Sequence, residues 1–287
     1  LMNYSAFSQG TYYPMGGFHE IIIGLSKLAK EKGVIINCDS NVDRLNIVNG
    51  NIENIVVNGE KLFFDGVIAS ADYHHVEQKL LEKPFRNYST EYWEKREMSP
   101  SSLLFYVGVD KRLNNLQHHN LFFDADFDQH AKEIYDNPKW PKNPLFYLSC
   151  PSITDPSLAP TGNENLMFLI PLAPGLEDTN EMREKYFDIV LKRLKDLTGN
   201  DIEKNIIFKK SYCVNDFEKD YNSFKGNAYG LANTLRQTAV LKPRMRNKKI
   251  KNLYYTGQLT VPGPGVPPSI ISGQIAAIEI DKYLNKL

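Results

Sequence analysis

Apolar residues recur at helical spacing near the start of the chain. Between residues 18 and 32 they stand three and four positions apart, and Gly33 follows as a helix stop. The pattern predicts an amphipathic helix with one buried face, formed by Phe18, Ile21, Ile22, Leu25, Leu28 and Ala29. Residues 34–37 then predict a short apolar strand.

The next stretch alternates β-rich runs with tight-turn signals. Asn49-Gly50 and Asn58-Gly59 can supply the positive φ angles that two-residue hairpin turns require. The runs that they separate lie at 42–48, 51–57 and 61–64. The sequence therefore predicts a three-stranded β-meander, followed by another strand at 66–70.

From about residue 84 the chain becomes richer in aromatic residues, with breaks at Pro, Asn and Asp clusters. Strands are expected at 103–109, 120–123, 145–149, 166–170 and 206–213. A helix at 182–197 would bury a face formed by Tyr186, Ile189, Val190, Leu194 and Leu197. Because strands and helices do not alternate regularly, we predict an antiparallel sheet with helices on one side, an α+β arrangement. The chain would end with a strand at 252–256, a turn, and a helix at 269–284.

Composition narrows the class of protein. Apolar residues make up 42% of the 287 residues and charged residues 24%, as in a packed globular protein. Lys plus Arg and Asp plus Glu each total 34, so no net charge favours nucleic acid as a partner. The one basic stretch, 242–251, is either a solvated loop or a contact for anionic lipid or pyrophosphate.

The cysteines and the apolar runs bear on location. Cys38, Cys150 and Cys213 lie far apart and lack the spacing of a disulfide framework or a metal site, which favours a reducing compartment such as the cytoplasm. No run approaches the roughly 18 apolar residues of a membrane span, and the first residues lack the order of a secretory signal. Any membrane contact is therefore expected to be peripheral.

The turn before the last helix is the strongest candidate for chemistry. It contains Gly257, Gly263 and Gly265, and Pro267-Pro268 open the helix. Glycines let the backbone approach a flat ligand, and the N-terminus of a helix carries about half a positive charge. Such an end would stabilise the negative charge that the N1–O2 edge of a flavin gains with a hydride. The alternative is a tight strand-to-helix connection without a ligand.

This turn does not carry the dinucleotide-binding fingerprint. Residues 263–268 read GPGVPP, so a proline occupies the sixth position of GxGxxG. No other segment supplies the motif. The pyrophosphate-binding turn of a dinucleotide fold is therefore absent from these residues.

Several blocks follow one another in an order typical of one enzyme family. The first of these blocks is GTYYPMGG at 10–17, and the last is NLYYTGQLTVPGPGVPPSIISG at 252–273. Between them lie blocks at 99–102, 107–110, 118–119, 151–162 and 226–230. Together they resemble the phytoene desaturases and related carotenoid desaturases, over essentially the whole chain. The resemblance implies an FAD-dependent oxidoreductase that desaturates a carotene by hydride transfer to the flavin.

The resemblance also implies a domain plan and a cofactor site. Residues 1–83 and 225–287 would form parts of an incomplete, glutathione-reductase-like FAD-binding domain of α/β type, and 84–224 the α+β substrate domain. The residues expected to contact FAD are Pro14, Met15, Gly16 and Gly17 near the flavin ring, Val42 at the adenine, Gly257 and Gln258 at the pyrophosphate and ribityl chain, and Gly265, Val266, Pro267 and Ile270 at the isoalloxazine edge.

Aromatic residues of the middle region would line a tunnel for a long apolar polyene. The candidates are Phe105, Tyr106, Phe122, Phe123, Phe146, Tyr147 and Phe168. For each of them the alternative is a place in the ordinary core. A substrate of this kind resides in the bilayer, so a membrane surface is an expected partner together with the carotenoid.

No catalytic side chain can be named from the sequence, and no metal site is expected. Neighbouring residues on a strand face opposite sides, so at most one of His118 and His119 would point into a site, and surface or supporting positions are the alternative. His74 and His75 are treated in the same way. The acid/base residues are expected in an N-terminal segment of the same enzyme, because the first residues here already resemble the middle of the family's chain.

Two other functions remain open. One is a non-catalytic or truncated fragment, or half of a split enzyme, that binds apolar ligands. The other is a flavin amine oxidase, which would surround a cationic amine with aromatic side chains instead of forming an apolar tunnel.

Overall fold

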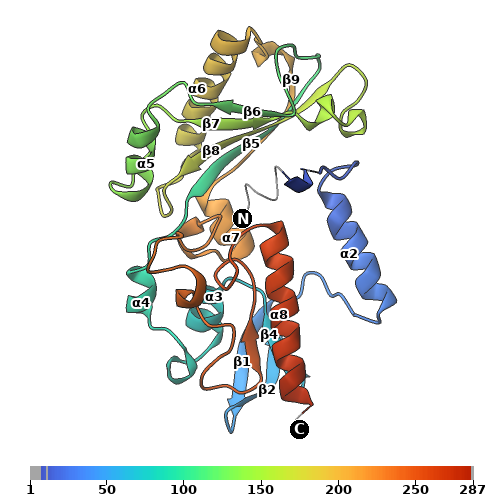
Figure 1. The fold of residues 1–287 in the computed structure, drawn as a ribbon, viewed down its shortest axis with the longest axis vertical. Coiled ribbons are helices and arrows are strands. Elements are labelled where there is room, and N and C mark those ends of the chain that lie inside the picture. The colour runs from blue at the N-terminus through green and yellow to red at the C-terminus, as the bar shows by residue number, and fades with distance from the viewer. Residues whose placement is uncertain (1–7, 11, 286–287) are drawn as a thin grey trace.

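Two groups of elements make up the fold, one at the top of Figure 1 and one at the bottom. The computed structural model describes residues 8–10 and 12–285. A five-stranded sheet with its helices forms the upper group, and a meander, a parallel strand pair and the last helix form the lower one. Among the described residues no helix combines the length and the apolar character needed to cross a bilayer.

The upper sheet is antiparallel throughout, in the order β6-β7-β8-β5-β9. Its strands are β5 (Ser101–Val109), β6 (His119–Phe122), β7 (Phe146–Ser149), β8 (Glu164–Leu172) and β9 (Ile206–Tyr212). The five strands expected from the sequence are thus confirmed, with ends shifted by at most two residues. Buried and half-buried positions alternate along all of β8, because one face of the sheet is covered and the other is more open.

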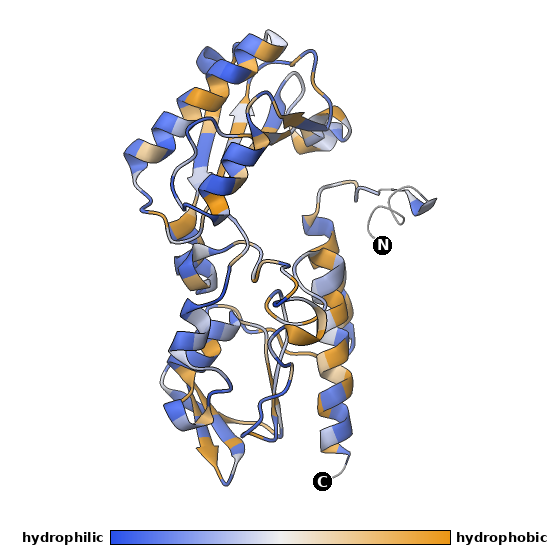
Figure 2. Ribbon diagram, turned by 60° about the vertical axis from the view of Figure 1, so that its left-hand side comes forward, coloured by the Kyte–Doolittle hydropathy of each residue, from blue (hydrophilic) through white to orange (hydrophobic). Residues whose placement is uncertain are grey.

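Helix α6 (Asn180–Thr198) covers one face of this sheet. It begins where the Thr179 hydroxyl accepts a hydrogen bond from the Met182 amide and ends at Gly199 in a left-handed conformation. Its alternation of apolar and polar residues is visible at the top of Figure 2. Tyr186, Val190 and Leu194 are buried as predicted, and Ile189 is partly buried against the same core. Leu197 was expected on this face but is 53% exposed.

Helix α5 (Phe127–Tyr135) borders the opposite face. A ring nitrogen of its His130 lies 2.9 Å from the carbonyl oxygen of Pro171 on β8. The helices are therefore not confined to one side of the sheet. The shorter helices are α3 (Tyr73–His75), α4 (Thr90–Glu94) and α7 (Val214–Tyr221).

The lower group contains the predicted meander, β1 (Val42–Val48), β2 (Asn51–Val57) and β3 (Glu60–Phe63). All four residues of the two Asn-Gly turns have positive φ, as hairpins of this kind require. Strand β4 (Val67–Ala69) pairs in parallel with β10 (Leu253–Tyr255). Helix α8 (Val266–Leu284) follows β10 and starts three residues earlier than expected.

Helix α2 (His19–Glu31) forms as predicted but buries none of its residues against the described part of the chain. Figure 1 shows it apart from both groups of elements. The strand expected at 34–37 is absent, and Ile35 there is 83% exposed. The reason is that a strand needs a hydrogen-bonding neighbour and an apolar helix face needs a counterpart, and the described residues supply neither.

Candidate functional site

A cavity of about 520 Å³ opens where β4 and β10 end. Ligands of parallel sheets commonly bind beyond the carboxyl ends of the strands. Its lining residues are Ser70, Ala71, Asp72, Tyr73, Phe217, Asp220, Tyr221, Asn222, Ser223, Asn227, Ala228, Thr256, Gly257, Gln258 and Leu259. Two residues singled out from the sequence, Gly257 and Gln258, therefore line it, whereas Asp72, Asn227 and the α7 residues were not anticipated.

A serine of α8 holds the start of the turn after β10. The Ser272 hydroxyl oxygen lies 2.7 Å from Oγ1 of Thr256, accepts a hydrogen bond of 3.0 Å from the Gly257 amide, and donates to the Ser269 carbonyl. Gly257 has a φ of 103°, which favours glycine. Ser272 is fully buried, so the turn is held in one conformation against α8.

A second contact holds the side chain of Gln258. The Asn227 Oδ1 atom accepts hydrogen bonds from Nε2 of Gln258, at 3.3 Å, and from the amide of Gly230, at 2.7 Å. A β-carbon added at Gly230 would lie 3.0 Å from the carbonyl oxygen of Gln258, and Gly230 has a φ of 74°. The 226–230 block noted in the sequence therefore packs directly on the turn.

Asp72 is a half-buried carboxylic acid in the lining of this cavity. Its two oxygens accept hydrogen bonds from the amides of His75, at 3.1 Å, and Phe224, at 3.4 Å. Burial raises the pKa of Asp72 to about 6, although these hydrogen bonds oppose the shift. Its position at the end of β4 was the sequence signal that could have identified it.

The raised pKa of Asp72 predicts a dependence of stability on pH. The folded protein keeps the proton that the unfolded chain loses above about pH 4, so the carboxyl group reduces stability as pH rises from about 4 to 6. Relative to wild type, Asp72→Asn should therefore gain about 3 kcal/mol in free energy of unfolding between these pH values. His74, whose pKa burial lowers to about 4, acts in the opposite direction in both proteins and cancels in the difference. Urea denaturation of both proteins at pH 4 to 7 measures the difference in free energy of unfolding. A difference that does not change with pH would contradict the prediction.

The N-terminus of α8 is open in the way expected for a ligand-binding helix end. Gly265 precedes the helix with a φ of 117°, and none of the side chains that the structure describes caps it. Val266 is 48% and Ile270 is 51% exposed, so the described residues leave apolar surface free beside the turn. Glycine backbone, an uncapped helix end and adjoining apolar side chains fit a flat, electron-rich group.

The other expected cofactor residues lie elsewhere. The Gly16 amide donates a hydrogen bond of 2.6 Å to Asp155, so the 14–17 segment, which includes Pro14, Met15 and Gly17, meets the loop after β7. Val42 on β1 pairs with Val57 on β2 and borders a separate hollow of about 540 Å³. Neither segment lines the cavity at β4 and β10.

The expected substrate aromatics separate by sheet face. Phe105 and Phe168 are 0% exposed, with the ring of Phe105 4.8 Å from that of Phe187 on α6. They are core residues, which corrects the expectation that they line a tunnel. Phe122, also buried, stacks on Phe146 at 4.2 Å. The physical reason is strand alternation: these positions share the face that α6 covers.

The opposite face borders a second cavity, of about 320 Å³, beside α5. Its lining residues are Pro100, Leu121, Phe123, Phe127, His130, Ala131, Ile134, Tyr135, Leu145, Phe146, Tyr147, Leu169 and Pro171. Three predicted aromatics are among them, namely Phe123, Tyr147 and Phe146, although Phe146 is only 1% exposed and its ring packs in the core on Phe122. Tyr106 lies on the same open face and is 40% exposed.

The two neighbouring histidines are close together instead of facing opposite ways. Their rings lie 4.2 Å apart, because His118 precedes the first residue of β6 and is not constrained by strand geometry. Nδ1 of His118 lies 3.0 Å from the Thr154 hydroxyl, and Nδ1 of His119 lies 2.6 Å from the Tyr147 hydroxyl. The His118 ring also contacts Tyr13 of the opening block.

Comparison with protein families gives a match over residues 1–281 to the flavin containing amine oxidoreductases. A carotenoid 3,4-desaturase of Haloarcula japonica is 41% identical over 277 residues, which cover 96% of this chain and 56% of that protein. A 4,4'-diapophytoene desaturase of Staphylococcus haemolyticus is 32% identical over 93% of this chain and 56% of its own length. The zeta-carotene-forming phytoene desaturase of Myxococcus xanthus is 28% identical, with coverages of 96% and 53%. The chain thus spans slightly more than half the length of these relatives.

Solved structures share the fold at low sequence identity. An oxidoreductase from Methanosarcina mazei superposes with a TM-score of 0.61 at 16% identity, over 93% of this chain and 55% of that one. A variant of putrescine oxidase gives 0.56 at 11% identity, with coverages of 93% and 53%. Both are oxidoreductases with mixed α/β sheets.

Proposed function

Because the chain belongs to the family of flavin containing amine oxidoreductases, we propose that it takes part in the FAD-dependent desaturation of a carotene. The flavin, when bound, would supply the chemistry of accepting a hydride from the substrate. The observation that carries this proposal is the 41% identity to a carotenoid desaturase, which extends through the turn and the cavity described above.

The residues that would hold FAD follow β10 near the C-terminus. Gly257 and Gln258 would bind at the β10 end, held by Ser272 and Asn227, while Gly265, Val266 and Pro267 would face the ring from the start of α8. The fold agrees with a flavin side formed by 1–83 and 225–287 and a substrate side formed by 84–224, because the whole five-stranded sheet lies within the latter range.

The open face of the five-stranded sheet would bind the polyene. The side chains of Tyr147 and Leu169, with those of α5, would orient an apolar chain and exclude water from it. Within the lining of this cavity the only ionisable side chains are histidine and tyrosine, and both ring nitrogens of His130 lie within hydrogen-bonding distance of backbone groups. With no carboxylate to pair with a cationic amine, the cavity favours a carotene over an amine substrate.

The mouth of this cavity offers a surface for membrane docking. Leu121, Phe123 and Phe127 are 65%, 61% and 63% exposed, and all three line the cavity. Exposed apolar side chains of this size bind the interfacial region of a bilayer. A carotene could then pass from the bilayer to the cavity without crossing water.

Phe123→Asp is accordingly expected to weaken binding to phospholipid vesicles about tenfold, because burying one phenylalanine contributes about 1.5–3 kcal/mol. Cosedimentation with vesicles measures this change. Phe63→Asp is the matched control, since Phe63 is 67% exposed on β3, away from the cavity. Equal loss in the two variants would show that docking does not involve the cavity mouth.

The test of the proposed function uses purified protein with FAD and a carotene such as phytoene. The expected result is a bound flavin whose absorbance is bleached by the carotene without oxygen, together with a product of longer conjugation. An amine that bleaches the flavin while carotenes do not would establish the amine oxidase instead. Absence of flavin binding would remove the oxidoreductase proposal and favour an apolar-ligand-binding fragment.

A further inference from the structure

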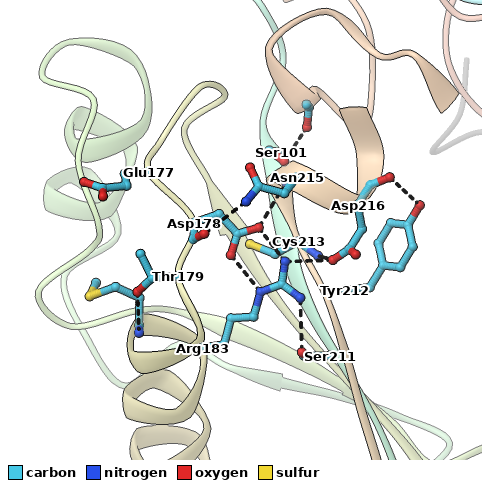
Figure 3. A network of polar contacts seen from close by, with 12 residues as sticks. Ser101, Glu177, Asp178, Thr179, Arg183, Ser211, Tyr212, Cys213, Asn215 and Asp216 are labelled. Atoms are coloured by element: carbon cyan, nitrogen blue, oxygen red, sulfur yellow. Dashed lines mark hydrogen bonds and ion pairs between the residues drawn. The ribbon is translucent and has the colours of Figure 1, made fainter. Parts of the chain in front are cut away.

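Charged groups inside this fold are generally paired. Figure 3 shows Arg183 between the carboxylates of Asp178 and Asp216, and buried Glu77 accepts hydrogen bonds from two backbone amides and a tyrosine hydroxyl. Lys242 is different. It is only 4% exposed, and among the residues that the structure describes its Nζ atom has no hydrogen-bond partner. A buried ammonium without a partner is strongly unfavourable, so this group calls for an explanation.

Lys242 belongs to the basic stretch 242–251, but it is not part of a solvated loop. It lies against the turn that opens α8: a β-carbon added at Gly263 would be 3.4 Å from Cε and 3.6 Å from Nζ of Lys242. Gly263 comes two residues before Gly265, at the uncapped N-terminus of this 19-residue helix. Two positive groups, an ammonium and a helix end, therefore converge on one turn.

We propose that Lys242 and the N-terminus of α8 together bind the electron-rich pyrimidine edge of the flavin, with Lys242 as a cofactor-contacting residue. This inference rests on the proposed function and deepens it, because it assigns a side chain to a site otherwise formed by backbone. The flexible stem of lysine allows Nζ to turn toward an acceptor at the surface of the turn. The flavin-free protein is then less stable than it could be, and the ligand supplies the missing acceptor.

The experiment compares Lys242→Met with wild type in two states. Without flavin, the variant is expected to melt about 2 °C or more above wild type, because it lacks the unpaired buried charge. With FAD, its dissociation constant, measured by flavin fluorescence, is expected to rise about tenfold or more, because it loses a charged hydrogen-bond donor. A merely structural lysine would not stabilise the flavin-free protein and weaken flavin binding when it is replaced. Lys249→Met removes the same charge from an exposed position of the same stretch and should change neither value.

Ligand fragments identify the group that Lys242 recognises. Riboflavin carries the ring system without a phosphate, and ADP carries the pyrophosphate without the ring. The proposal expects weaker binding of riboflavin to Lys242→Met and unchanged binding of ADP. It is overturned if only ADP binding weakens, if FAD binds both proteins equally, or if the flavin-free variant melts below wild type. A wild-type protein that binds no flavin would remove the proposed function as well, whereas unchanged binding to the variant would remove this inference alone.

Discussion

Replacing Leu169 with arginine is expected to lower carotene turnover by roughly 100-fold while flavin binding remains near that of wild type. Leu169 lines the apolar cavity on the open face of the five-stranded sheet, opposite Tyr147 on the neighbouring strand. A guanidinium there would have to lose its water without gaining a partner, which costs several kcal/mol, and each 1.4 kcal/mol is a factor of ten. Turnover and flavin titration on the same preparation measure the two effects.

The matched control is Leu197→Arg, which adds the same charge at a position 53% exposed on α6. It should leave turnover unchanged. Leu169→Trp provides a second variant that fills the cavity without adding a charge, should arginine prevent folding. Full turnover in both Leu169 variants would show that the carotene binds elsewhere.

Arg183→Met is expected to reduce the free energy of unfolding by about 3–5 kcal/mol, because it leaves a buried carboxylate without its partner. Nε of Arg183 donates to one oxygen of Asp178 at 2.7 Å and a terminal nitrogen donates to the other at 2.5 Å, while the Asp178 side chain is 0% exposed. The same carboxylate accepts the Asn215 amide, so the pair joins the start of α6 to α7 (Figure 3). A fall of about 10 °C in melting temperature corresponds to this change.

Two further variants test whether the ion pair of Arg183 and Asp178, and not the loss of one positive charge, accounts for the lower stability. Lys192→Met breaks an exposed contact with Asp196 on the same helix and should cost no more than about 0.5 kcal/mol. Arg183→Met combined with Asp178→Asn removes both charges and should recover part of the lost stability. No recovery in the double variant would mean that Arg183 stabilises through packing instead of pairing.

The helices, strands and turns that depend on short stretches of sequence could be predicted from those stretches. The two Asn-Gly turns define the meander because they satisfy positive φ angles that few other residues accept. Helix α6 begins two residues before and ends one residue after the predicted range, and it buries Tyr186, Val190 and Leu194 as its periodicity predicts. The glycine- and proline-rich turn could likewise be located before α8, and two of its expected contact residues, Gly257 and Gln258, line the cavity.

The remainder of the candidate site could not be read from the chain. Asp72, Asn227 and Ser272 meet around Gly257 although 155 and 45 residues separate the first two and the last two in sequence. The core positions of Phe105 and Phe168 depend on which sheet face α6 covers, and strand alternation alone does not reveal that choice. Side-chain type was therefore a poor guide to which aromatics face a cavity.

The sequence by itself determined the family, the kinds of elements and the turn at the start of α8, because these depend on interactions between residues close together in the chain. Only the tertiary structure decided that the described residues leave the apolar face of α2 uncovered, that Leu169 instead of Phe168 borders a cavity, and that Lys242 is buried. Burial and charge pairing depend on which distant segments come together, and no single stretch of sequence contains that information.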